Sequence, residues 1–278
     1  MALSGYEQKA LEEIETYFRE PEDSLLGRAS RSLFKPIEVV SERLIPDKVL
    51  AIAGSGVERI LSGISSVSDR TVSVDQVLRE ARKHGEVSTL RELRELDLRT
   101  LDKTAEEIAS QHQVAAMLEG AGCGLGGAAL LAADIPLLFG VCMRVVRQLG
   151  ACYGVDPEAP GEGVVALKVF ELACGGTRNR YAELLELDTL CDELDQLEPQ
   201  RRAEKAAVLA SLFMSREATK RIVQLLLSRK MFQALPIVGA AVGAGFNYLF
   251  VADVAETATQ VYRRRFLQEK LRQAEQPM

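Results

Sequence analysis

The sequence predicts an all-α protein: a single multi-helix bundle with two central glycine-rich apolar helices and a long C-terminal helix. Two observations predict this class. Apolar residues recur at helical spacing along almost the whole chain, and the period-two alternation that marks exposed strands is missing. The 278 residues include no tryptophan and few aromatic residues, so contacts between aliphatic helix faces have to form the core. Without a low-complexity linker, we expect one domain over residues 1–278.

Helix start and stop signals define the N-terminal elements. Ser4 and Glu7 have the spacing of a capping box, which predicts a first helix over residues 4–20 that stops before a proline. A second helix should cover residues 24–44, and Pro46 should begin a third.

The middle of the chain carries a second capping signal and a leucine stripe. Ser73 and Gln76 should open a helix that ends at His84, with Gly85 as a left-handed cap. The segment "STLRELRELDLRTLDKTAEEIASQHQ" should be amphipathic helix with one or two breaks and a solvated charged face. Its stripe consists of Leu90, Leu93, Leu96, Leu98 and Leu101.

Three more helices are expected after residue 156. Asp156 and Pro157 suit the start of a helix, but the following proline and glycines delay its regular part until about Val164. Helices over residues 178–197 and 199–229 should follow before the long C-terminal helix.

Composition excludes several function classes. The chain carries 34 Lys and Arg against 40 Asp and Glu, a net charge of -6, so we expect no nucleic-acid partner. The N-terminus lacks a basic region followed by an apolar one, which predicts a cytoplasmic protein without a secretory signal. The cysteines form no C-x-x-C pair and suit a reducing compartment as apolar packing residues; they are Cys123, Cys142, Cys152, Cys174 and Cys191.

The stretch "GAGCGLGGAALLAADIP", residues 120–136, contains the G-x-G-x-x-G spacing of a dinucleotide-binding turn. Such a turn comes directly after a β-strand, and an acidic residue that binds the ribose lies about twenty residues further along the chain. Here the preceding "TAEEIASQHQVAAMLE" is helical, and the downstream "CMRVVRQLG" has no acid. We therefore expect no nucleotide and no other cofactor.

On a helix, the same glycines fall four residues apart and allow another backbone to approach closely. The uncharged stretch 231–252 repeats this spacing. Three interpretations are open for the two stretches: buried core helices, reversible membrane association, or permanent spans. The candidate packing or membrane-association residues are Gly120, Gly122, Gly124, Gly126, Gly127, Gly239, Gly243, Gly245, Phe246 and Phe250.

Charge placement disfavours permanent spans. A second span that starts after Arg229 and Lys230 would export the basic segment 263–272, against the positive-inside tendency. Asp134 at a helix centre in lipid would cost roughly 3 kcal/mol. The basic segment itself could bind a lipid surface locally.

Three blocks resemble the EcsC protein family: the glycine block beginning "AMLEG", then "ALKVFELA", and "LPIVGAAVGAGFNYLFVADVAETATQVYRRRFLQEK". The resemblance is best over residues 90–272, with the helices of residues 1–46 packing on this region. The family takes its name from a gene beside the two components of an ABC transporter. The resemblance implies a bacterial, mainly helical protein with a membrane or transporter connection, and it supplies no catalytic residues.

We therefore expect a non-catalytic cytoplasmic protein that associates reversibly with a membrane or a membrane-transporter component. The alternative is a helical enzyme or ligand-binding or metal-binding protein with a buried carboxylate pocket. Its chemistry would have to come from a few polar residues, because the chain has no Glu-x-x-His and no G-x-S-x-G, and both histidines, His84 and His112, suit a helix surface. Exposed glycine faces could also pair chains into an oligomer. The candidate pocket residues are Asp134, Asn247, Asp253 and Glu256, although Asp134 also suits a helix cap before Ile135 and Pro136.

Overall fold

The computed structural model describes residues 3–20, 47–65, 72–123, 127–175, 179–230 and 240–275. All regular elements in these ranges are helices, which confirms the all-α prediction. The predicted helix over residues 24–44 lies outside the described residues. The helices are α1 (Gly5–Arg19), α3 (Asp47–Ser65), α4 (Val74–Ala81), α5 (Leu90–Leu93), α6 (Leu98–Cys123), α7 (Gly127–Cys152), α8 (Glu162–Cys174), α9 (Arg180–Asp195), α10 (Pro199–Phe213), α11 (Arg216–Lys230) and α12 (Ala240–Glu275).

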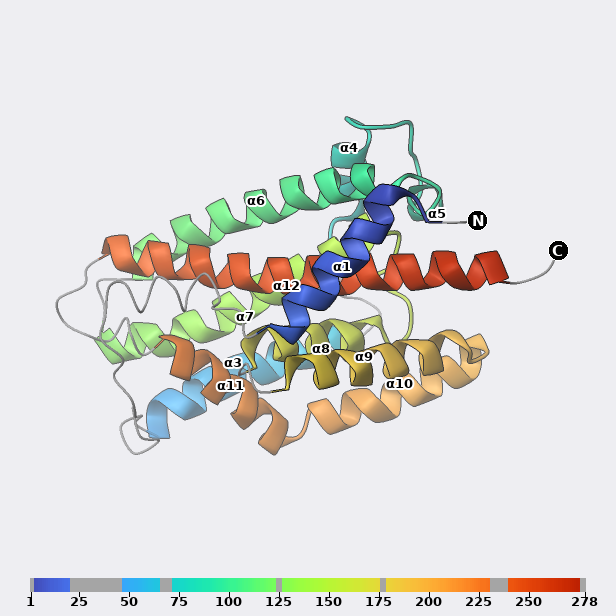
Figure 1. The fold of residues 1–278 in the computed structure, drawn as a ribbon. Coiled ribbons are helices and arrows are strands. Elements are labelled where there is room, and N and C mark those ends of the chain that lie inside the picture. Colours follow the sequence, from blue (N-terminus) through green and yellow to red (C-terminus); the bar gives the residue numbers. More distant parts are fainter. Residues whose placement is uncertain are drawn as a thin grey trace.

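The long C-terminal helix α12 runs through the middle of the bundle (Figure 1). Its 36 residues extend for roughly 54 Å at 1.5 Å per residue. It packs against α6, α7 and α8, and α1 crosses its outer face. Helix α6 runs in the opposite direction to α7 and α12, so the C-terminal end of α6 and the N-terminal ends of α7 and α12 share one end of the bundle (Figure 1).

The first capping box forms as predicted. The Ser4 hydroxyl accepts a hydrogen bond from the Glu7 amide, and the Glu7 carboxylate accepts one of 2.8 Å from the Ser4 amide. At α4 only half of the box forms, because the side-chain oxygen of Gln76 accepts a hydrogen bond from Gln148 instead. The interhelical contact with α7 thus replaces the local one.

The predicted end of α4 is wrong. The helix ends at Ala81, and its cap Arg82 has a right-handed φ of -60°. Among the described glycines, only Gly154 and Gly161 have a positive φ, so Gly85 is not a left-handed cap. A three-residue turn stabilised by the bond from Arg82 Nε to the Val87 carbonyl takes its place.

Helix α7 starts earlier than expected and continues through Pro136. Asp134 is therefore an interior residue and not a helix cap. Alanine and leucine, both strong helix formers, fill the turns before it. The proline ring packs against α3, where a Cβ on Gly56 would lie 2.3 Å from Pro136 Cγ.

The leucine stripe agrees with the sequence prediction, whereas the helix breaks agree only in part. Leu93, Leu98 and Leu101 are buried, and α5 and α6 are separated by one break, as predicted. The single helix predicted over residues 199–229 is instead two, α10 and α11, with a turn at Met214 between them.

Candidate functional site

Charge is distributed unequally along the three long helices. In α6, residues 108–118 carry no charged side chain, and in α12 the first charge is Asp253. In α7, Asp134 is the only charge before Arg144. Because α6 is antiparallel to the other two helices, these segments lie at the same end of the bundle (Figure 1). We call residues 108–118, 127–143 and 240–252 together the charge-poor end.

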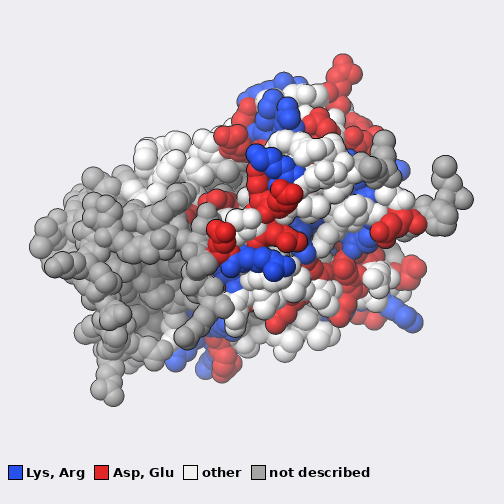
Figure 2. Space-filling model, viewed as in Figure 1, with Lys and Arg blue, Asp and Glu red and all other residues white. Residues whose placement is uncertain are grey.

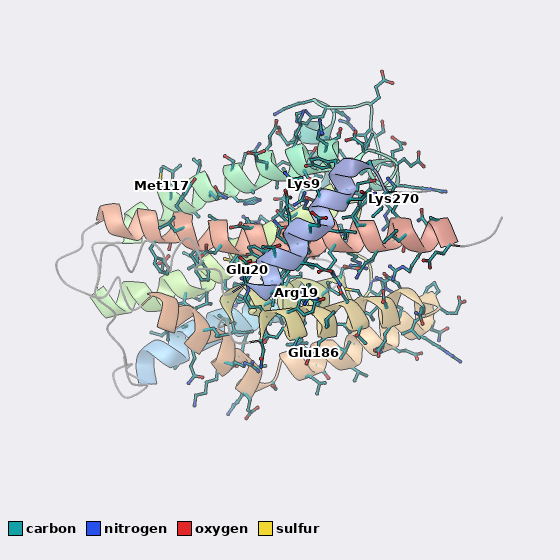
Figure 3. All side chains as sticks on the ribbon, viewed as in Figure 1. Lys9, Arg19, Glu20, Met117, Glu186 and Lys270 are labelled. Atoms are coloured by element: carbon teal, nitrogen blue, oxygen red, sulfur yellow. The ribbon has the colours of Figure 1, made fainter. Side chains whose placement is uncertain are left out.

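Helix α6 exposes apolar side chains at the charge-poor end. Val114, Met117 and Leu118 are 47%, 39% and 67% exposed. Their spacing of three and four residues places them on one face of the helix. Figure 3 shows Met117 on the outer side of α6, and the described surface there is uncharged in Figure 2. These residues were not among the candidates predicted from the sequence, although their helical spacing in an uncharged segment was a usable signal.

The aromatic candidates lie inside the bundle. Phe246 and Phe250 are buried, and their rings stack with centroids 5.9 Å apart. They can meet lipid only if α12 separates from its neighbours. The exposed apolar surface at this end comes instead from α6 and from Leu137 of α7, which is 58% exposed.

The structure describes only some of the candidate glycines. Gly124, Gly126 and Gly239 lie outside the described residues, and Gly120, Gly122, Gly127 and Gly243 belong to helical backbone. A Cβ added to Gly245 would have no heavy atom within 4 Å. Among the described glycines, close helix packing occurs at Gly56 and at Gly150, where a Cβ would lie 2.9 Å from Tyr262 Cζ.

Three of the four pocket candidates are buried. Asp134, Asn247 and Asp253 are 4%, 2% and 6% exposed, whereas Glu256 is exposed. The two aspartates and Glu256 each have an interaction partner within the chain. No group of three His, Cys, Asp or Glu side chains suited to a metal occurs in the described ranges. The carboxylates therefore form neither an exposed acid-base pair nor a metal-ligand set there.

The described histidines and cysteines have packing or polar partners. His112 is buried rather than on the surface, and its Nε2 bonds to the side-chain oxygen of Gln148. Burial lowers the pKa of His112, which keeps the imidazole neutral, although the bond to Gln148 acts in the opposite direction. Cys142, Cys152, Cys174 and Cys191 are free and buried, and burial raises the pKa of Cys191 to about 12. These four thiols are unsuited to nucleophilic chemistry.

The basic segment of α12 does not form a free lipid-binding patch. Its five cations all pair with carboxylates inside the protein. Figure 2 shows blue and red side chains interleaved on the visible face of the charged part of the molecule. The pairs join Arg263 to Asp102 and Glu13, Arg264 to Asp188, Arg265 to Glu162 and Asp195, Lys270 to Glu7, and Arg272 to Asp192 and Glu269.

A polar cleft of about 1000 Å³ lies beside these pairs, between the C-terminal half of α12 and the loop that joins α7 to α8. Arg202, Arg265, Lys270 and Arg272 contribute to its lining, and each is already paired with a carboxylate. An anion that contacted these four residues would have to displace their carboxylates.

One helical segment in the described part of the chain is long and apolar enough to cross a membrane. It is Asp134–Cys152, with a mean hydropathy of 1.4, and 78% of it is buried in the bundle. This degree of burial is typical of the core helix of a water-soluble bundle.

The model of the EcsC protein family matches residues 7–267. The chain belongs to the EcsC protein family. Protein EcsC of Bacillus subtilis (strain 168) is 28% identical over 262 residues, which cover 94% of this chain and 95% of that protein. The uncharacterized protein YdbA of the same strain is 25% identical over 240 residues, 85% of each chain. No solved structure matches the chain. The EcsC match extends beyond residues 90–272 into α1.

Proposed function

We propose that the protein is a non-catalytic cytoplasmic protein that associates reversibly with the surface of a lipid bilayer through its charge-poor end. One observation carries the proposal. Three long helices bring their charge-poor segments to the same end of the bundle, and α6 exposes Val114, Met117 and Leu118 there. A clustered apolar surface on one end of a water-soluble protein is typical of a membrane or protein interface.

The uncharged part of α12 is by itself too short to span a bilayer. In α12, residues 240–252 extend for about 20 Å along the helix. The hydrocarbon core of a bilayer is about 30 Å thick, so this length reaches past the bilayer midplane but is shorter than a full span. Asp253 and the paired basic segment follow directly and favour the aqueous side.

The experiment is co-sedimentation of the full chain with vesicles of neutral lipid and of neutral lipid mixed with anionic lipid. We expect binding to both, because apolar contact supplies most of the free energy. The triple variant Val114→Glu, Met117→Glu and Leu118→Glu should reduce the bound fraction by about tenfold, since charged side chains resist transfer into lipid.

A matched control comes from α10. Val208 and Leu212 are 62% and 63% exposed, but they lie outside the charge-poor end. The variant Val208→Glu with Leu212→Glu should bind vesicles like the unaltered protein. Equal loss of binding in both variants would refute the proposed surface. Binding to native membranes without binding to protein-free vesicles would assign the same surface to a membrane-transporter component instead of lipid.

A further inference from the structure

Helix α11 is strongly basic although the chain as a whole is acidic. Its sequence, REATKRIVQLLLSRK, holds five Lys or Arg and one acid, Glu217, whereas the net charge of the chain is -6. The helix packs against α3 and α7. Figure 1 shows α11 running toward the end of the bundle at which α7 and α12 begin. A basic helix therefore lies at the edge of the charge-poor end.

Three cations of α11 form an exposed basic face, which consists of Arg216, Lys220 and Arg221. Ile222 and Leu226 are buried, and their spacing of four residues places them on the side of the helix that packs on the bundle. The three cations lie on another side, turned toward solvent. Basic side chains are visible in this region of the molecule in Figure 2.

The basic face of α11 lacks the internal pairing of the basic segment in α12. Within the described ranges, Arg216, Lys220 and Arg221 form no ion pair. The charge of Arg221 acts on the carboxyl of Glu183 in α9, where it opposes the rise in pKa that burial causes. Glu217, also exposed, adds one negative charge to the helix. The positive charge of this face is thus only partly neutralised within the protein.

We propose that the basic face of α11 binds the headgroups of anionic lipids while the charge-poor end enters the hydrocarbon. This inference rests on the proposed membrane association. When an apolar end enters a leaflet, the headgroups contact the helices at its edge, and α11 is such a helix. Lys and Arg side chains at that level are attracted by the negative surface potential of anionic lipid. The rest of the acidic molecule is repelled by the same potential, so the basic face also orients the protein as it approaches.

The test compares two affinities of the full chain at low ionic strength. One is for vesicles of phosphatidylcholine, and the other is for phosphatidylcholine vesicles that contain phosphatidylglycerol. We call the ratio of the second affinity to the first the anionic preference, and co-sedimentation over a range of lipid concentrations measures both. We expect a preference of about tenfold or more, since each Lys or Arg near an anionic surface contributes about fivefold. Added salt should reduce it, because the cations are exposed.

Two variants of α11 should change the anionic preference in opposite directions. Arg216→Gln with Lys220→Gln and Arg221→Gln should reduce the preference to about twofold or less and leave the affinity for phosphatidylcholine unchanged. Glu217→Gln removes the acid of this helix and should raise the preference, by up to about fivefold. Neither variant alters a buried side chain, so both should fold like the unaltered protein.

A matched control variant replaces three cations at the opposite end of the bundle. Arg79 of α4, Arg91 of α5 and Lys103 near the start of α6 are exposed and likewise form no ion pair in the described part of the chain. Figure 1 places these helix segments far from the charge-poor end. Replacement of all three by Gln changes the net charge as much as the α11 variant does. The control should keep the full anionic preference.

Three results would overturn the inference: no anionic preference in the unaltered protein, an unchanged preference in the α11 variant, or an equal loss in the α11 variant and the control. The proposed apolar surface is tested separately, by the affinity for phosphatidylcholine alone. That affinity should fall in the variant of Val114, Met117 and Leu118 and not in the α11 variant. A failure of one proposal is therefore distinguishable from a failure of the other.

Discussion

Arg265 donates hydrogen bonds of 2.8 Å from both Nη atoms to the two carboxylate oxygens of Glu162. Glu162 is buried in the first turn of α8, where a negative charge also interacts favourably with the helix N-terminus. Arg202 adds a bond of 2.9 Å to the same carboxylate, and Asp195 accepts from both arginines. Four helices, α8, α9, α10 and α12, are thereby joined through two acids and two arginines.

The variant Glu162→Gln should destabilise the protein by about 3 kcal/mol. Removal of one charge leaves the mostly buried Arg265 without its bidentate partner, which costs far more than the loss of a surface pair. Urea denaturation measures the change. Glu193→Gln is the control, because the pair of Glu193 with Lys205 is half exposed and worth at most about 1 kcal/mol. Equal effects in the two variants would contradict a structural role for the buried network.

The ion pairs of this network show why some features could be predicted from the sequence and others could not. Helices were predictable because each depends on local periodicity, and the capping box at Ser4 needs only its own turn. The pairing of the basic segment could not be predicted, because the acids that pair with it come from four other helices. One of them, Glu162, is 103 residues from Arg265 in the chain. A run of five cations on one helix predicts a basic surface until those partners are known.

The glycines illustrate the same limit. Among the described glycines, tight contacts occur at Gly56 and Gly150, which the sequence did not single out. Whether close helix packing requires a glycine at a given position depends on the residue that packs opposite it. Pro136 and Tyr262, the residues opposite, are distant in sequence. The prediction that Asp134 caps a helix was wrong for a related reason. Pro136 lies inside α7, where its ring packs on Gly56, a residue distant in sequence.

Gly150→Ala should destabilise the protein by about 1 to 3 kcal/mol, despite the better helix propensity of alanine. The new methyl group would lie 2.9 Å from Tyr262 Cζ and 3.0 Å from Cε1, and the tyrosine is itself buried. Gly245→Ala on α12 is the matched comparison. No heavy atom lies within 4 Å of its new Cβ, so it should stabilise by about 0.5 to 1 kcal/mol. Thermal unfolding of the two variants should therefore shift in opposite directions, and a shift in the same direction would contradict the packing assigned to Gly150.

Acid should loosen the attachment of α1 through Glu7. Burial alone would raise the pKa of Glu7, but hydrogen bonds from Lys270 and Ser4 together outweigh it and lower the pKa below the usual 4.5. The folded state then binds fewer protons than the unfolded state. This contribution to stability is complete above about pH 4.5 and is lost as the pH falls through the folded-state pKa.

The variant Glu7→Gln isolates this effect. Its free energy of unfolding should be lower than that of the unaltered protein at neutral pH, and the difference should shrink as the pH falls below 4.5. Urea denaturation between pH 3 and pH 7, roughly the range over which an aspartate or glutamate titrates, measures the difference. A difference that is independent of pH would show that the carboxylate charge contributes nothing.

Asn247→Leu should leave the stability within about 1 kcal/mol of the unaltered protein or raise it. Asn247 is 2% exposed, and no donor in the described part of the chain reaches its Oδ1. A buried polar atom without a partner has already lost its hydrogen bonds to water, so an apolar side chain of similar size removes a cost. Asn247→Asp has almost the same shape but adds a charge at the charge-poor end, and it should destabilise by several kcal/mol or titrate with a strongly raised pKa. Chemical denaturation of both variants checks the difference, and a loss above about 2 kcal/mol in Asn247→Leu would mean that the amide has a partner whose removal is costly.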